Sequence, residues 1–250
     1  MNQANLPSQA QRFAARERPS GYTVMKQRWS HLLFLHWEIE PELVQQSLPE
    51  GLYVDTFHGK TYLGVVPFFM ERIRPVCCPP VPGISWFQEL NFRAYVHDKD
   101  GQPGIWFYSL DCNQWLAVKV ARKFFNLPYQ HAKMSSFKKN DELYYQSQRY
   151  GEEKMQTFSY PASLDSYREA APDSLEFFLL ERYRLFSVDC SNVIYQGMVN
   201  HTPYQFQPVT VEDDSSRLFS LAGFEEPEVA PVSSMIANTV DVDIFPLRRA

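Results

Sequence analysis

Apolar and polar positions alternate cleanly along residues 89–96, ELNFRAYV. Because successive side chains of a strand point to opposite faces, this segment predicts a strand with two chemically different faces. The apolar face holds Leu90, Phe92, Ala94 and Val96. The polar face holds Glu89, Asn91, Arg93 and Tyr95. This polar face either lines a ligand site or is the solvated outer face of a half-buried strand, which is common in antiparallel sheets.

Strand patterns also occur on both sides of this segment. Residues 29–37, WSHLLFLHW, form a short apolar run whose length favours a strand buried on both faces, with His36 as a core histidine. Residues 52–69 predict a hairpin, since His58 and Gly59 suit a two-residue turn. Further strand-like segments are 104–110, 129–134, 142–150, 154–160, 184–199 and 238–249.

Three helices are expected between the strands. Pro41 suits the first position of a helix, because its missing N–H would have no partner there. Asp111 begins a capping-box pattern and is the predicted N-cap of a second helix, which Asn126 and Pro128 end. Asp173 is the predicted N-cap of a third, SLEFFLLERY. Strands outnumber helices and cluster in hairpins, so we predict a mostly β fold of the α+β class, an antiparallel sheet with a few flanking helices.

The first 24 residues differ in character from the rest of the chain. They are polar and aperiodic, and they predict a disordered tail before a single domain over residues 25–250. A transit peptide is the alternative, because Arg12, Arg16 and Arg18 occur there with one acidic residue. These residues lack the apolar core of a secretory signal.

Composition limits the partners that the chain can have. Of the 250 residues, 24 are basic and 29 acidic, which gives a net charge of −5, and no run of five like charges occurs. Nucleic acid is therefore not an expected partner, because phosphate binding needs a clustered basic face. No apolar run approaches the ~20 residues that span a bilayer, so we expect no membrane association and a cytoplasmic protein.

Cysteines, histidines and glycines give no sign of a metal site or a cofactor. The 4 cysteines lack CxxC spacing and are expected to be free thiols. The 6 histidines lie far apart and match no metal-binding spacing. There is no glycine-rich phosphate loop, so neither a metal nor a nucleotide cofactor is predicted.

Several motifs together resemble a known family. In chain order they are FLHWEIEPELVQQSLPEGLYVDTFHGKTYLGVVPF, PPVPG, ELNFRAYV, WFYSLD, AVKVARKFFNLPY, LLERYRLFS and VDVDIFPLRR. They resemble the uncharacterised YqjF-like proteins of the acetoacetate decarboxylase-like superfamily. The resemblance implies a large, cone-like antiparallel β-barrel around a small-molecule cavity. Because members of this superfamily often assemble, it also implies a possible homo-oligomer.

The chain departs from the decarboxylases at the position of their reactive lysine. Those enzymes carry a GRE-x-x-G-[FY]-P-K-K segment, whose first lysine after the proline forms a Schiff base with the keto acid. The matching ARKFFNLPYQ keeps Arg122 and Pro128 but has Tyr129 and Gln130 in place of the two lysines. Neither side chain has an amine, so the resemblance implies a related cavity without imine chemistry. The lysines that could substitute are Lys119, Lys123 and Lys133.

The candidate site residues come from the polar strand face and from the segment after the second helix. Glu89 matches a cavity-lining acid of the decarboxylases and is the predicted acid/base group, with Tyr129 as a donor to a carbonyl or enolate oxygen. The alternative for Tyr129 is a packed ring with a locally satisfied hydroxyl. The predicted substrate-binding residues are Arg93, Asn91, Gln130, His131 and Arg122.

The predicted function is binding of a small organic carbonyl or carboxylate ligand in the central cavity, with lyase, hydratase or isomerase chemistry by Glu89 and Tyr129. Two alternatives remain at this point. The first is a non-catalytic small-molecule binding or sensing protein. The second is an interaction module whose barrel is filled by side chains and has no cavity.

Overall fold

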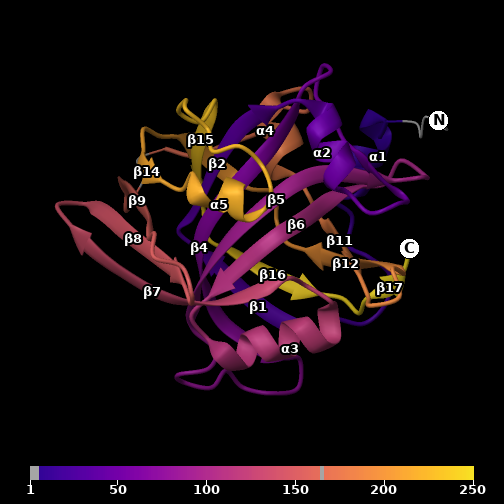
Figure 1. Cartoon of the computed structure of the whole chain (residues 1–250). Helices are drawn as coiled ribbons and strands as arrows, with labels where there is room; N and C mark the ends of the chain where they lie inside the picture. The colour runs from indigo at the N-terminus through magenta and orange to yellow at the C-terminus, as the bar shows by residue number, and fades with distance from the viewer. Residues whose placement is uncertain (1–5, 164–165) are drawn as a thin grey trace.

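A closed ring of strands forms the centre of the computed structural model, which describes residues 6–163 and 166–250 (Figure 1). The ring consists of β1 (Met25–Ser30), β4 (Thr61–Pro75), β5 (Phe87–Asp98), β6 (Pro103–Cys112), β11 (Arg184–Val188), β12 (Ile194–Asn200) and β16 (Val240–Ile244). Each strand pairs with the next, and β16 returns to β1. The pairs are antiparallel except β6–β11. The predicted mostly β fold with few helices is confirmed.

Two further groups of strands extend from this ring. From β4 the sheet continues through β2 (Leu32–Ile39), β15 (Ser233–Ala237), β13 (Gln205–Pro208) and β10 (Arg168–Glu169). From β6 the chain passes into an outer sheet of β7 (Tyr129–Lys139), β8 (Glu142–Arg149), β9 (Gln156–Pro161) and β14 (Glu212–Asp214). The short β17 (Arg248–Arg249) pairs with β12.

Strand β5 is buried on both faces. Its apolar face, predicted from the alternation, packs in a second core against β2, the outer sheet and α5 (Arg217–Leu221). Its polar face points into the ring. The alternative of a solvated outer face is therefore wrong, because the polar face is buried and lines the cavity, while the outer sheet and α5 cover the apolar face.

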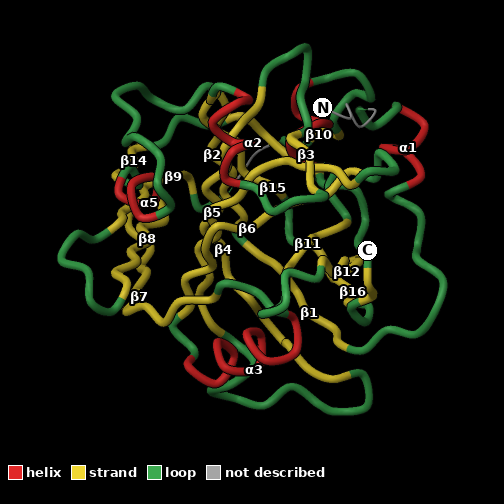
Figure 2. Tube along the Cα trace, turned by 45° about the vertical axis from the view of Figure 1, so that its right-hand side comes forward, coloured by secondary structure: helices red, strands yellow, loops and turns green. Residues whose placement is uncertain are grey.

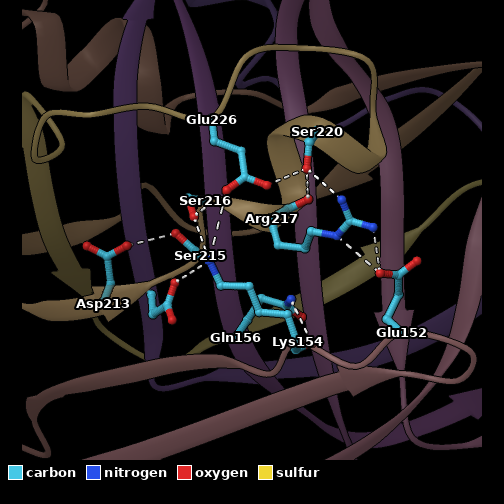
Figure 3. A network of polar contacts seen from close by, with 10 residues as sticks. Glu152, Lys154, Gln156, Asp213, Ser215, Ser216, Arg217, Ser220 and Glu226 are labelled. Atoms are coloured by element: carbon cyan, nitrogen blue, oxygen red, sulfur yellow. Dashed lines mark hydrogen bonds and ion pairs between the residues drawn. The ribbon is translucent and has the colours of Figure 1, made fainter.

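A polar network joins α5 to the loop after β8 (Figure 3). Arg217 donates to Glu152 at 2.8 Å, and the Ser220 hydroxyl donates to Glu226 at 2.6 Å. Ion pairs near the surface, such as this partly buried one, contribute about 0–1 kcal/mol each. The apolar packing of Phe219 against Trp37 and Phe92 therefore does more than the network to hold α5 on the sheet.

The helices begin close to the predicted places but with different caps. Helix α2 (Pro41–Ser47) has Pro41 at its first position, as predicted. Helix α3 (Trp115–Phe125) ends at Asn126 with φ of 50°, also as predicted, but its N-cap is Gln114. Asp111 instead lies in β6, which continues to Cys112, and its buried carboxylate pairs with Arg149 at 2.7 Å.

Helix α4 (Leu175–Leu180) and the predicted hairpin also differ from expectation. The N-cap of α4 is Ser174, whose hydroxyl accepts from the Phe177 N–H, and not Asp173. The turn at His58-Gly59 has positive φ at both residues but closes only a single bridge between Phe57 and Lys60. The preceding strand, β3 (Leu52–Val54), pairs with β5 and not with β4.

The segment predicted to be a disordered tail contains a short helix and is tied to the domain. Helix α1 (Gln9–Ala14) has a capping box between Ser8 and Gln11. Arg12, Arg16 and Arg18 form ion pairs with Asp55, Glu181 and Asp243 respectively. All three partners are distant in the sequence, so no local pattern indicates these contacts. Residues 1–5 of that segment lie outside the described residues.

No helix in the described ranges is long and apolar enough to cross a membrane. The longest is α3, with 11 residues, whereas a bilayer core needs roughly 20.

Gly104 permits the parallel contact that closes the ring between β6 and β11. A Cβ atom at this position would lie 2.6 Å from the Phe186 ring and 3.1 Å from the Arg184 backbone oxygen. We expect Gly104→Ala to lower the free energy of unfolding by about 1–3 kcal/mol, because the added methyl group overpacks a rigid site. Urea unfolding measures this change. The loss should shrink when Phe186→Leu is combined with it, and an equal loss in both backgrounds would contradict the assignment.

Candidate active site

The strand ring encloses a cavity of about 160 Å³. Helix α3 closes one end, contributing Ala117, Val120, Ala121 and Phe125 to its wall. The segment from the last residue of α4 into β11 lies at the other end, and Figure 1 shows the two helices at the bottom and top of the molecule. In the rotated view of Figure 2, α3 again lies beneath the strands. The cavity removes the alternative of a barrel filled by side chains.

Most of the wall is apolar, and the polar groups come mainly from one strand. Glu89, Asn91 and Arg93 project into the cavity from β5, as their alternation predicts. Tyr129, the first residue of β7, joins them. The Tyr129 hydroxyl donates a hydrogen bond of 2.7 Å to Glu89 Oε2. Glu89 is 2% and Tyr129 8% exposed, so the pair is shielded from bulk water.

The end of α3 places Tyr129 at the cavity. Asn126 adopts the left-handed conformation that stops the helix, and Pro128 prevents its continuation. The Arg122 guanidinium donates to the Tyr129 backbone oxygen at 2.6 Å and to the Gln130 side chain at 3.1 Å. These contacts hold the turn from outside. Arg122 and Gln130 therefore do not line the cavity, in contrast to their predicted substrate-binding role.

His131 also lies away from the cavity. Its half-buried ring stacks on Tyr150, with 4.6 Å between the ring centroids. Strand β7 leaves the ring here and pairs with β8 from Ala132 onward, so the alternation that starts at Tyr129 no longer points inward. Of the predicted substrate-binding residues, the structure brings only Arg93 and Asn91 to the cavity.

Burial determines the protonation of the Glu89–Tyr129 pair. Loss of solvation raises the pKa of Glu89 from 4.5 to about 7, although the Tyr129 hydroxyl and the Asn91 amide oppose the rise by stabilising the carboxylate. Burial and the nearby Glu89 charge raise the pKa of Tyr129 well above 10. Near neutral pH, Glu89 can thus give or take a proton, while Tyr129 stays neutral and donates a hydrogen bond.

Two arginines that the sequence analysis did not select line the same cavity. Arg184 is the first residue of β11 and Arg182 lies two residues before it. Arg182 pairs with Asp55 at 2.7 Å. The available signal was the Glu-Arg-Tyr-Arg sequence at 181–184, in which two arginines follow the apolar end of a helix. Surface ion-pair networks also contain acidic and basic residues this close together, so the sequence alone did not identify Arg182 and Arg184 as cavity residues.

Among the residues that the structure describes, the cavity has neither a lysine for an imine nor a cluster of metal ligands. No lysine is among the side chains that line the cavity, and Lys119, Lys123 and Lys133 are exposed. Within residues 6–163 and 166–250, no three His, Cys, Asp or Glu side chains gather closely enough to hold a metal ion.

His36 is a buried core histidine, as predicted, and it is bonded through Nε2 to the Tyr95 hydroxyl at 2.7 Å.

Sequence comparison identifies the family. The DUF2071 profile, described as "Uncharacterized conserved protein (COG2071)", matches residues 26–241. The chain belongs to the DUF2071 family. This DUF2071 chain is 35% identical over 231 residues to the uncharacterized protein YqjF of Bacillus subtilis (strain 168), an alignment that covers 92% of the chain and 94% of YqjF. The resemblance to YqjF-like proteins is confirmed.

Solved structures share the fold of this DUF2071 chain. An acetoacetate decarboxylase-like enzyme from Sphingomonas wittichii RW1 superposes with a TM-score of 0.61 at 10% identity, covering 92% of this chain and 94% of that one. The enduracididine biosynthesis enzyme MppR, complexed with pyruvate, superposes with a TM-score of 0.62 at 12% identity and 93% coverage of both chains. The predicted acetoacetate decarboxylase-like fold is therefore confirmed, and at this identity the likeness shows the fold alone.

Proposed function

We propose that the cavity binds a small organic carbonyl or carboxylate compound and that Glu89 and Tyr129 transfer protons on it, as in a lyase, hydratase or isomerase. The observation that carries this proposal is the 2.7 Å hydrogen bond between the two buried side chains inside a mainly apolar cavity. The shared fold supports it, because MppR binds the keto acid pyruvate within the same architecture.

In an enolisation the two groups have complementary tasks. The Tyr129 hydroxyl turns from Glu89 to the substrate carbonyl oxygen and donates a hydrogen bond, which stabilises the charge that develops there. The Glu89 carboxylate takes the proton from the adjacent carbon, so the C–H electron pair becomes the C=C bond of the enolate. Glu89 then returns a proton to that carbon, and the electron pair on the oxygen re-forms the C=O bond. A Glu89 pKa of about 7 leaves a large fraction of the carboxylate ready to act as base at neutral pH.

Deuterium exchange tests this chemistry. We expect the wild-type protein to exchange the α-protons of keto acids or ketones for deuterium in D₂O. Proton NMR measures this exchange as the loss of the α-proton signals. Glu89→Gln should slow exchange by about 10²–10⁴-fold, because general-base catalysis contributes this much. Tyr129→Phe should slow it less, because water or Asn91 can still approach the oxygen.

An exposed tyrosine–glutamate pair offers a matched control. Tyr144 donates to Glu142 at 3.0 Å on the outer face of β8. Glu142→Gln and Tyr144→Phe repeat the two chemical changes outside the cavity and should leave exchange unchanged. Equal exchange by wild type and Glu89→Gln would contradict the proposed role of Glu89.

A second experiment tests the proposed chemistry without an imine. Borohydride treatment in the presence of acetoacetate should leave the protein mass unchanged, because no lysine lines the cavity among the described residues. Intact-protein mass spectrometry provides the measurement. A reduced adduct on any lysine would show that imine chemistry occurs after all.

A non-catalytic binding or sensing protein is the second candidate. The largely apolar wall favours it, since such a wall can retain a hydrophobic ligand without any reaction. Retention of a ligand in native mass spectrometry, together with no exchange on any retained compound, would support this candidate against the enzyme.

A further inference from the structure

We propose that the cavity has an anion site at its α4 end, where Arg93 and Arg182 bind the carboxylate of a medium-chain organic acid. The apolar chain of this acid fills the ring and brings a distal carbonyl to Glu89 and Tyr129 at the α3 end. The inference deepens the proposed function and rests on it for the distal carbonyl, whereas the anion site is argued from Arg93 and Arg182 themselves.

Arg93 is a buried cation without a counter-ion in the protein. It is 7% exposed and donates to the Tyr95 hydroxyl at 3.2 Å and the Leu179 backbone oxygen at 3.4 Å. Its guanidinium lies 5.2 Å from the centre of the Phe34 ring. Among the described residues no carboxylate pairs with it, and its Nε has no hydrogen-bond partner. Since a buried, uncompensated charge is costly, a bound anion is the natural partner.

Arg182 adds positive charge to the same region. It is 6% exposed, and its Nη2 atom has no partner within the described part of the chain. Its counter-ion Asp55 is shared with Arg12, at 2.7 Å and 2.6 Å. Arg12, Arg93 and Arg182 thus oppose one nearby carboxylate, which leaves an excess of positive charge. The Tyr95 ring joins the two cavity arginines, with its centre 5.6 Å from the Arg93 guanidinium and 5.1 Å from that of Arg182.

The carboxylate of Glu181, close to this end, is engaged elsewhere. Glu181 accepts from the Tyr183 hydroxyl and from the Tyr204 backbone N–H, and it pairs with Arg16 at 3.4 Å. Its carboxylate therefore does not neutralise Arg93. Arg184 is the third cavity arginine, and Asp98 lies 3.8 Å from it.

The spacing along β5 argues for a ligand longer than a β-keto acid. Glu89 and Arg93 are four residues apart on one strand, which corresponds to about 13 Å between their Cα atoms. Apart from Asn91, which lies between them on β5, most of the cavity wall is apolar, and it includes Val66, Phe68, Ile105, Phe107 and Val199. A carboxylate and a carbonyl joined through one carbon, as in acetoacetate, cannot use both ends with an apolar wall between them. Acids of the length of hexanoate or octanoate match this arrangement.

Calorimetric titration of unreactive acids tests the anion site and the chain separately. Affinity should rise about 4-fold per added CH₂ from butanoate through hexanoate to octanoate, because each buried CH₂ contributes about 0.8 kcal/mol. Methyl octanoate and octylammonium should bind at least tenfold more weakly than octanoate. Equal binding of the ester and the acid would overturn the anion site. Equal binding of butanoate and octanoate would overturn the apolar chain.

The variant Arg93→Met separates a ligand-binding role from a structural one. It should weaken octanoate binding at least tenfold and raise the Tm of the ligand-free protein, because it removes a buried charge that lacks a partner. Arg217→Met, at an arginine that pairs with Glu152 outside the cavity, is the matched control and should leave octanoate binding unchanged. A lower Tm for Arg93→Met together with unchanged octanoate affinity would assign Arg93 a purely structural role.

Failure of this inference can be told apart from failure of the proposed function. Octanoate has no ketone carbonyl and so cannot exchange a proton at Glu89, and its binding therefore reports on the anion site alone. Tight octanoate binding without proton exchange on any oxo acid would uphold the anion site and contradict the catalytic role. Exchange on uncharged ketones without any preference for carboxylates would uphold the catalytic role and contradict the anion site.

Discussion

Replacing Asp55 by Asn is expected to lower the free energy of unfolding by about 3–5 kcal/mol. Asp55 is fully buried and bonds both Arg12 and Arg182, which hold its pKa below the ordinary value against the effect of burial. Asn keeps the shape but removes the charge, so Arg182 stays buried without a counter-ion. The same substitution also releases Arg12, and with it the hold of α1 on the domain.

Urea unfolding at neutral pH measures this loss. Asp241→Asn is the matched control, because Asp241 is bonded to Arg28 at 2.8 Å but its side chain is 74% exposed. It should change the free energy of unfolding by less than about 1 kcal/mol. Because the pKa of Asp55 is lowered by folding, its stabilising effect is present above the unfolded pKa and falls away in acid. A loss below about 1 kcal/mol for Asp55→Asn would contradict the ion-pair account.

Glu89→Gln is expected to stabilise the protein in a pH-dependent way. Folding raises the pKa of Glu89 from 4.5 to about 7, so the folded state binds the proton more tightly than the unfolded chain. Stability therefore falls as pH rises between these values, and above pH 7 the ionised group costs roughly 3 kcal/mol. Gln cannot ionise, so at pH 8 the variant should unfold with a free energy higher by about that amount.

The pH profile distinguishes this effect from a general change in packing. Below the unfolded pKa, both states of the wild type carry a protonated Glu89, and the two proteins should have similar stability. Glu142→Gln, at an exposed carboxylate, should show no such divergence with pH. A constant difference between wild type and Glu89→Gln from pH 4 to 8 would mean that Glu89 does not titrate as described.

The fold could be predicted from the sequence wherever local patterns determine it. The alternation in ELNFRAYV identified both faces of β5, and Asn126 with Pro128 identified the end of α3. Helix caps were less predictable. Asp111 begins a capping pattern, but β6 continues to Cys112 and the Asp111 carboxylate forms an ion pair with Arg149. The pairing of β3 with β5 was missed because a favourable turn at His58-Gly59 does not fix which strand lies alongside.

The candidate site was predictable in part for a similar reason. Glu89, Asn91 and Arg93 share a strand face, so one correct strand assignment placed all three. His131 was misplaced because β7 changes partner beyond its first residues, which no local pattern reveals. The link among Arg12, Asp55 and Arg182 joins segments that are far apart in the chain, and only the folded arrangement brings them together.

The most direct test of the account is a titration of Glu89 itself. Carbon-13 NMR of protein labelled at the glutamate carboxyl carbons follows each group across pH 4 to 9, and Glu89→Gln assigns the signal. The account predicts a midpoint at about 7, which should move higher in Tyr129→Phe because the hydroxyl that stabilises the carboxylate is gone. A midpoint near 4.5 that Tyr129→Phe leaves unchanged would contradict the claim that these two residues form a proton-transfer pair.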